Sequence, residues 1–288
     1  MATVWHPWRT ASASVPRQGV VTPAPTTHRF DAQRAMALVR LQLRAGPRPA
    51  GSIALAGVAE RLRRLLPGGH FEAVPATTKT PRPLRNIVGE LPGAGKPVLV
   101  GAHYDTQPYP PGFVGANDAA AAVAVVLQIA RELQSHPRPA GAPAIRFVLF
   151  DGEESPTENT DDFYRDALRG SKAYAAAHAS ELSAMILLDY LGNRGVRLPR
   201  EATSDAALWE RIRTAAAQVG VGAVFPPTTE EAIFDDHTPF LRAGVPAVDL
   251  IDWSYRPYDD NRDVYARLSS RSVDAVGETM LQVLGAPA

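Results

Sequence analysis

Four apolar segments of this chain each lead into acidic or histidine side chains. They lie at residues 98–100, 145–150, 184–188 and 247–251, and they lead to His103 and Asp105, to Asp151-Gly152-Glu153-Glu154, to Asp189, and to Asp259-Asp260. Short apolar runs of this length are typical of strands buried in a sheet. In an open α/β sheet, ligands bind beyond the carboxyl ends of the strands. If the four strands share one sheet, their polar ends meet at one site.

Helical patterns separate these strands. Apolar residues recur at helical spacing over residues 31–44 and 52–66, and further helices are expected over residues 119–134, 171–179, 204–219, 238–242 and 269–284. Residues 71–90 are expected to form two edge strands, the second at 86–90. This alternation predicts an α/β fold: a single-domain three-layer sandwich with a mixed, mostly parallel twisted sheet and helices on both faces.

The length and composition limit the remaining possibilities. The 288 residues predict one catalytic domain over residues 29–288, preceded by an extended N-terminal arm over residues 1–28. Thirty basic residues balance thirty acidic ones, so neither nucleic acid nor an anionic membrane is an expected partner. The absence of cysteine excludes disulfides and thiolate ligands. No apolar run suits a membrane span or a secretion signal, so a cytoplasmic location is expected.

A cluster of histidine and carboxylate side chains needs a positive centre, because neighbouring carboxylates repel one another. The expected centre is a metal ion, with zinc the leading choice. His103 would bind through one ring nitrogen while Asp105 accepts the other N–H; the alternative is a strand-end histidine satisfied by a loop. Asp118 either ligates or bridges metal ions, or caps the helix that follows it.

Adjacent glutamates follow the strand at residues 145–150. Either Glu153 or Glu154 could bind metal while the other moves protons, although a solvated acidic loop is the alternative. Asp189 is either a ligand or a turn residue. Asp236 is a candidate acceptor for the catalytic glutamate, and His237 is expected at the start of a helix rather than as a ligand.

Taken together, these motifs resemble the zinc aminopeptidase and glutaminyl cyclase superfamily. The resemblance rests on GPRPAGS at 46–52, NIVGEL at 86–91, GAHYDT at 101–106, GAND at 115–118, FDGEE at 150–154, GS at 170–171, LLD at 187–189 and DHTPFL at 236–241. The long stretch between the glutamates and Gly170, at residues 155–169, and the sequence at 235–241 are closer to the cyclases. The sequence at 115–118 is closer to the peptidases.

The resemblance implies two ligand sets and a general base. One zinc ion would bind His103, Asp118 and Asp189, and a second would bind Asp118, Glu154 and a late histidine. Glu153 would be the general base. The cyclases with one ion use the second set.

The late histidine is absent, since no histidine follows His237. An ungapped match places Asp259 at its position, and a second alignment places Arg256 there. Asp259 would complete an all-carboxylate set that favours manganese or magnesium more than the usual set does. Arg256 would instead neutralise the carboxylates with a fixed cation. One or two zinc ions are therefore expected. If only one binds, it is expected at the His103 set, because that set is complete.

The expected function is metal-dependent processing of an amide next to a free amine, either hydrolysis or cyclisation. The substrate would be a small molecule or a peptide, bound in a pocket for which Phe113, Phe234, Trp253, Tyr258 and Arg256 are candidates. Two alternatives stay open. One is a repurposed acyl or amide transferase or cyclase of specialised metabolism with reduced or no metal dependence, and the other is a non-catalytic binding protein on the same fold.

Overall fold

A six-stranded sheet forms the centre of the computed structural model, which describes residues 21–75, 80, 82–158, 161–257 and 260–285. Its strands are, in spatial order, β1 (His70–Ala73), β2 (Arg85–Leu91), β4 (Pro143–Phe150), β3 (Ala94–His103), β5 (Ala184–Asp189) and β8 (Ala247–Ile251). The last four strands run parallel to one another, whereas β2 runs antiparallel to both of its neighbours, β1 and β4. The prediction of a mixed, mostly parallel sheet is therefore confirmed. A separate pair joins β6 (Arg200–Glu201) to β7 (Thr229–Glu230).

The strand at residues 86–90 is not at an edge. It belongs to β2, which lies between β1 and β4 and pairs with β4 from Ile87 to Leu91. Residues 86–89 are all buried, on both faces of the sheet. Among the described strands only β1 matches the expectation of an edge strand in this part of the chain. The unbroken apolar run at Ile87 and Val88 is the signal for a strand covered on both sides.

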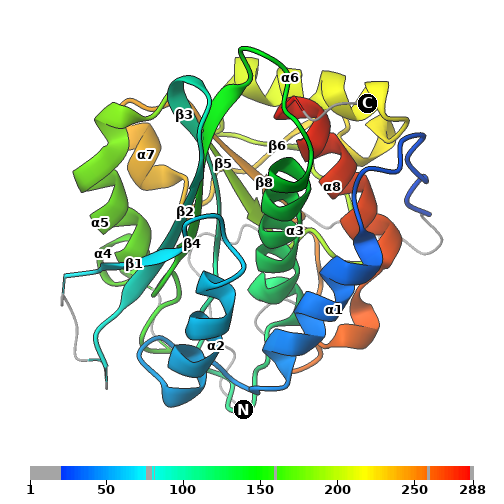
Figure 1. The fold of residues 1–288 in the computed structure, drawn as a ribbon. Helices are drawn as coiled ribbons and strands as arrows, with labels where there is room; N and C mark the ends of the chain where they lie inside the picture. The colour runs from blue at the N-terminus through cyan, green and yellow to red at the C-terminus, as the bar shows by residue number, and fades with distance from the viewer. Residues whose placement is uncertain (1–20, 76–79, 81, 159–160, 258–259, 286–288) are drawn as a thin grey trace.

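Helices cover both faces of the sheet, as predicted (Figure 1). One face carries α4 (Phe163–Asp166), α5 (Arg169–His178) and α7 (Thr238–Arg242), and the other carries α1 (Ala32–Leu43), α2 (Ile53–Arg63), α3 (Ala122–Ser135), α6 (Ala206–Gln218) and α8 (Ser270–Val283). Short helical turns lie at Ala179–Glu181, Gly222–Val224 and Tyr265–Arg267. Helix α3 contacts the sheet, α1 and α8. All its residues from 122 to 130 are buried, which explains its alanine-rich and uniformly apolar sequence.

Side-chain caps mark the start of three helices. Asp31 accepts a hydrogen bond from the Arg34 amide at 2.9 Å, and Ser52 and Asp205 cap α2 and α6 in the same way. Each cap satisfies a backbone donor that has no partner within the helix. These caps explain why the helix starts could be predicted to within about two residues.

The described part of the predicted arm is docked on the domain. The Thr26 amide donates to the carbonyl of Val219 at 3.0 Å. The buried carboxylate of Glu278 in α8 accepts hydrogen bonds from the Thr27 hydroxyl at 2.7 Å, the Arg29 side chain at 3.0 Å and the Phe30 amide at 2.7 Å. The rest of the arm, residues 1–20, lies outside the described residues. Among the described residues, no helix is long and apolar enough to cross a membrane.

We expect Glu278→Ala to lower the free energy of unfolding by about 3 kcal/mol, because it leaves several buried donors and the Arg29 charge without their acceptor. Glu210→Ala is the matched control, since Glu210 is an exposed helix residue paired with Arg213 and its loss should leave the free energy of unfolding almost unchanged. Urea denaturation at neutral pH measures both. Equal effects of the two substitutions would contradict the docking role of Glu278.

Candidate metal-binding active site

The carboxyl ends of three parallel strands bring the predicted acidic and histidine side chains together. His103 is the last residue of β3, Asp189 is the last residue of β5, and Glu153 and Glu154 follow β4. Strand β8 ends beside them at Ile251, which lines the same cavity. Asp259, the predicted ligand beyond β8, lies outside the described residues.

His103, Asp118 and Asp189 form a compact buried cluster. The Nε2 atom of His103 lies 3.0 Å from Asp118 Oδ1 and 3.7 Å from Asp189 Oδ1. One ligand atom from each residue lies within 4.8 Å of the other two. One imidazole and two carboxylates at this spacing are a donor set that fits zinc.

The charge of this cluster favours a cation. Burial raises the pKa of Asp189 to about 8; the nearby His103 opposes the rise, and repulsion from Asp235 and Asp118 adds to it. A bound cation would remove the cost of keeping these carboxylates ionised together.

A second group joins His103 to Glu153 and Glu154, again with one ligand atom from each within 4.8 Å. Glu154 also accepts a hydrogen bond from the Gln107 amide at 3.0 Å. Within the described part of the chain, neither group combines Asp118 with Glu154. The second predicted set also needs Asp259, which lies outside the described residues, so this set stays a prediction.

Glu153 is poised to hold a proton. Burial raises its pKa well above the usual range; His103 opposes this rise, and the negative charges of Glu154, Asp235 and Asp236 add to it. Its side chain lines the cavity over the cluster. A carboxyl group with a raised pKa can take and return a proton near neutral pH, as a general base must.

Asp105 holds the backbone of the two glutamates. Its carboxylate accepts hydrogen bonds from the amides of Glu153 at 3.2 Å and Glu154 at 3.4 Å. Asp105 is also the carboxylate that faces the His103 ring, as predicted, but Nδ1 lies 3.7 Å from Asp105 Oδ1, which is longer than a hydrogen bond. Arg169 completes the support by donating to the carbonyl oxygens of Gly152 at 3.1 Å and Glu154 at 2.9 Å.

Asp118 lies in an irregular turn and does not cap a helix. Its backbone angles (φ −109°, ψ 88°) are not helical, and α3 begins four residues later without a side-chain cap. The capping alternative is therefore wrong. Asp263 fixes the turn by accepting hydrogen bonds from the amides of Asn117 at 2.9 Å and Asp118 at 3.1 Å, and Tyr255 donates to the same carboxylate at 2.8 Å.

Arg48 supplies a buried positive charge beneath this turn. Its side chain is completely buried and donates to the carbonyl oxygens of Gly46, Val114 and Gly115. Burial lowers its pKa to about 10, while the charges of Asp118, Asp105 and Asp263 oppose the decrease. The sequence at residues 46–52 contributed to the family resemblance, but the hydrogen bonds of Arg48 to the turn before Asp118 were not foreseen.

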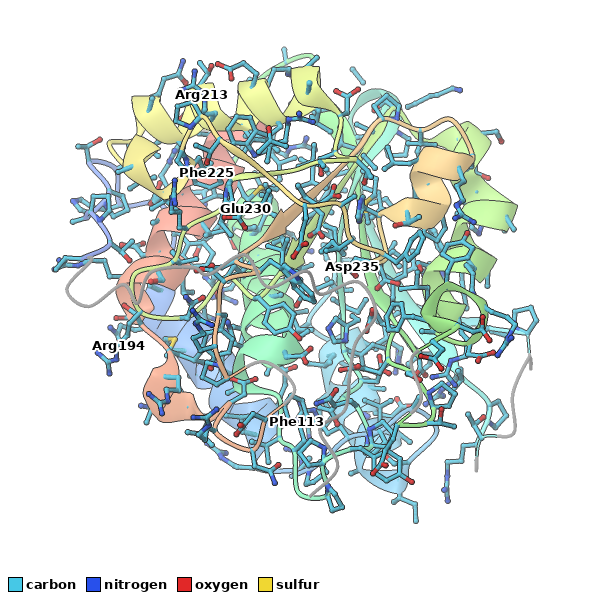
Figure 2. All side chains as sticks on the ribbon, turned by 180° about the vertical axis from the view of Figure 1, so that it is seen from behind. Phe113, Arg194, Arg213, Phe225, Glu230 and Asp235 are labelled. Carbon is cyan, nitrogen blue, oxygen red and sulfur yellow. The ribbon has the colours of Figure 1, made fainter. Side chains whose placement is uncertain are left out.

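Two residues that line the site were also missed. Tyr190 has a left-handed backbone conformation (φ 42°), and its hydroxyl donates to Asp118 Oδ2 at 2.9 Å. Asp235, near the middle of the view in Figure 2, lines the cavity. The predicted Asp236 is fully buried, and its negative charge helps to raise the pKa of Glu153. The positions of the two missed residues directly beside Asp189 and Asp236 in the sequence were the available signals.

His237 lies where the sequence indicated. It directly precedes α7, is fully buried, and belongs to neither of the metal-binding groups of the described residues. Its Nε2 atom lies 2.9 Å from the Thr203 hydroxyl and 3.3 Å from Glu201, so the ring stabilises the loop that carries Thr203 along the cavity wall.

The cavity above the acidic cluster has a volume of about 790 Å³. Two of the predicted walls, Phe234 and Trp253, line it. Phe113 does not: it is buried in the protein and lies apart from Asp235 in Figure 2. Arg256 is exposed and does not line the cavity either, and Tyr258 lies outside the described residues. Aromatic side chains are more often buried in the core than exposed in a pocket, which accounts for Phe113.

We expect Asp263→Ala to weaken zinc binding about 10- to 100-fold, because the amides that position Asp118 lose their acceptor. Asp260→Ala is the matched control, since within the described residues the Asp260 side chain accepts hydrogen bonds only from Arg262. Isothermal titration of the metal-free protein with zinc measures both variants. Unchanged affinity in a folded Asp263→Ala protein would mean that Asp118 needs no such support.

Comparison with known proteins agrees with this geometry. Residues 86–284 match the family described as "Peptidase family M28". A glutaminyl-peptide cyclotransferase-like protein of Mus musculus is 31% identical over 223 residues, which are 66% of this chain and 57% of the mouse protein. A glutaminyl-peptide cyclotransferase of Bothrops jararaca is 28% identical, covering 78% of this chain and 72% of its own.

Solved structures show the same likeness. The glutaminyl cyclase of Porphyromonas gingivalis superimposes with a TM-score of 0.80 at 28% identity, covering 90% of this chain and 99% of its own. A Zn-dependent exopeptidase of Parabacteroides distasonis superimposes with a TM-score of 0.78 at 25% identity, covering 93% of this chain and 100% of its own. From the matched residues and the converging strand ends, we conclude that this chain belongs to peptidase family M28.

Proposed function

We propose that this protein is a zinc-dependent enzyme that acts on an amide next to a free α-amine, with cyclisation of an N-terminal glutamine as the leading reaction. The observation that carries the proposal is the buried cluster of His103, Asp118 and Asp189 beside Glu153, at the floor of a cavity large enough for a peptide end. The cyclotransferase and cyclase relatives support it over the two alternatives, a repurposed acyl or amide transferase and a non-catalytic binding protein.

In this proposal His103, Asp118 and Asp189 hold the ion. Bound zinc supplies a Lewis acid that polarises the carbonyl group of the amide. Glu153 takes a proton from the α-amine of the substrate as its nitrogen attacks the side-chain amide carbon, and returns a proton to the departing ammonia. Asp105 keeps Glu153 in place through the backbone bond already described. The aromatic walls at Phe234 and Trp253 limit access of competing water.

Hydrolysis of an N-terminal residue is the second candidate. The same Glu153 would take its proton from water and deliver it to the leaving amine. The complete His103, Asp118 and Asp189 set favours this reaction, because by resemblance the one-ion cyclases use the other set. Likeness to a Zn-dependent exopeptidase agrees with it.

A direct comparison of two substrates tests the proposal. We expect the zinc-loaded protein to convert a glutaminyl peptide to its pyroglutamyl form, with ammonia release and the matching mass loss, faster than it cleaves a leucyl amide. Glu153→Gln should lower kcat at least about 100-fold, because the proton acceptor is lost. Glu158→Gln is the matched control, since Glu158 is exposed and lines the same cavity.

The two reactions have different products, so the outcome separates them. If leucine is released faster than pyroglutamyl peptide is formed, hydrolysis and not cyclisation is the main reaction. Failure of both reactions in protein with bound zinc would end the proposal, as would full activity of Glu153→Gln.

We further propose that a single zinc ion binds, at the His103 set. Dialysis against a chelator should abolish activity, and zinc should restore it at one equivalent per chain. Asp259→His should increase the bound zinc toward two equivalents if Asp259 replaces the late histidine of the family. Asp260→His, one position along, is the control. Elemental analysis measures the metal content, and two equivalents in the unaltered protein would contradict the single-ion proposal.

A further inference from the structure

Arg242 places a fixed positive charge on the wall of the cavity. It is the last residue of α7, its side chain is exposed, and it lines the cavity above the acidic cluster. Its guanidinium carbon lies 3.6 Å from the centre of the Tyr164 ring and 5.7 Å from that of Phe234, and the two rings are 5.4 Å apart. Stacking on aromatic rings restricts an arginine side chain while leaving its N–H donors available.

Arg242 makes no ion pair with any residue that the structure describes, and aromatic rings are its recorded contacts. Arg165, which follows Tyr164 in the sequence, is different. Arg165 pairs with Asp162 at 2.5 Å and with Asp166 at 2.8 Å, so its charge is already balanced. An arginine that is held in place and faces a cavity without an acidic partner is suited to bind an anionic group of a ligand.

The floor of the same cavity has the opposite charge. Glu153, Glu154, Asp189 and Asp235 all line it, and they suit the amine of a substrate. A sphere of the cavity's volume, 790 Å³, is about 11 Å across, and two or three extended residues span about 7–10 Å. One short peptide can therefore place its amine at the floor and an anionic group near Arg242.

We propose that Arg242 binds a carboxylate of the substrate, so that the enzyme prefers short peptides with a negative charge two or three residues from the reacting amine. This inference rests on the proposed function. The carboxylate can be the C-terminus of a di- or tripeptide or an acidic side chain that follows the first residue. Both sources present the same planar pair of oxygens to the guanidinium.

Three peptide types distinguish the sources: a glutaminyl dipeptide with a free C-terminus, the same dipeptide as its C-terminal amide, and a glutaminyl-glutamate amide. We expect KM for the free acid to be about three- to tenfold lower than for the neutral amide, and the difference to shrink at high salt. A low KM for the glutamate amide as well would assign the site to side chains and chain ends alike; a low KM for the free acid alone would assign it to chain ends.

Arg242→Gln should raise KM for the free acid to the KM of the neutral amide, because the charge that binds the carboxylate is lost. Arg165→Gln is the matched control, since this second arginine is already paired and its loss should leave the preference intact. Equal KM values for acid and amide in the unaltered enzyme would overturn the inference, and so would a preference that survives in Arg242→Gln.

A binding measurement separates this inference from the proposed reaction. Calorimetry on the zinc-loaded Glu153→Gln protein, which lacks the proton acceptor for either reaction, uses the dipeptide as free acid and as C-terminal amide, with and without Arg242→Gln. Tighter binding of the acid, lost in Arg242→Gln, supports the carboxylate site even if no peptide is turned over. Equal affinities overturn it even if cyclisation is confirmed.

Discussion

Repulsion between buried carboxylates is the constraint on which this structure depends. The parallel strands β3, β4 and β5 end at one place, and they bring the largely buried carboxyl groups of Asp105, Glu153 and Asp189 together there. Burial and the neighbouring negative charges raise the pKa of both Glu153 and Asp189, so ionisation of these groups is unfavourable in the protein alone. Such a cluster is stable only where hydrogen bonds and positive charges offset the repulsion.

The surrounding chain supplies this compensation in two ways. Backbone amides bind Asp105 from one side, and Asp263 binds the amides that orient Asp118 from the other. In the irregular turn before α3, Asp118 has non-helical backbone angles, and its carboxylate lies 3.0 Å from the His103 ring. Uncompensated charge then remains on the cavity side, where His103, Asp118 and Asp189 form a set that fits a divalent cation. Stability and proposed chemistry thus depend on the same groups.

Much of the fold and the grouping of His103, Asp118 and Asp189 could be predicted, because they depend on local sequence patterns. Apolar runs and helix caps located the strands and helices, and the residues at the strand ends included His103, Glu153 and Asp189. The contacts of Tyr190 with Asp118, and of Asp263 with the same turn, join positions 72 and 145 residues apart, so no local pattern reports them. Phe113 was misplaced because a pocket wall and a core residue have the same composition.

The buried guanidinium of Arg48 limits how far the chain can be shortened from its N-terminal side. The region shared with the M28 family begins at residue 86, yet Arg48 lies well before it and reaches the underside of the turn that carries Asp118. A fragment cut to the shared region would keep every proposed ligand but lose this counter-charge and the two helices, α1 and α2, on either side of it. A fragment with boundaries drawn from family likeness alone would therefore contain the proposed ligands but lack the arginine that supports the turn carrying Asp118.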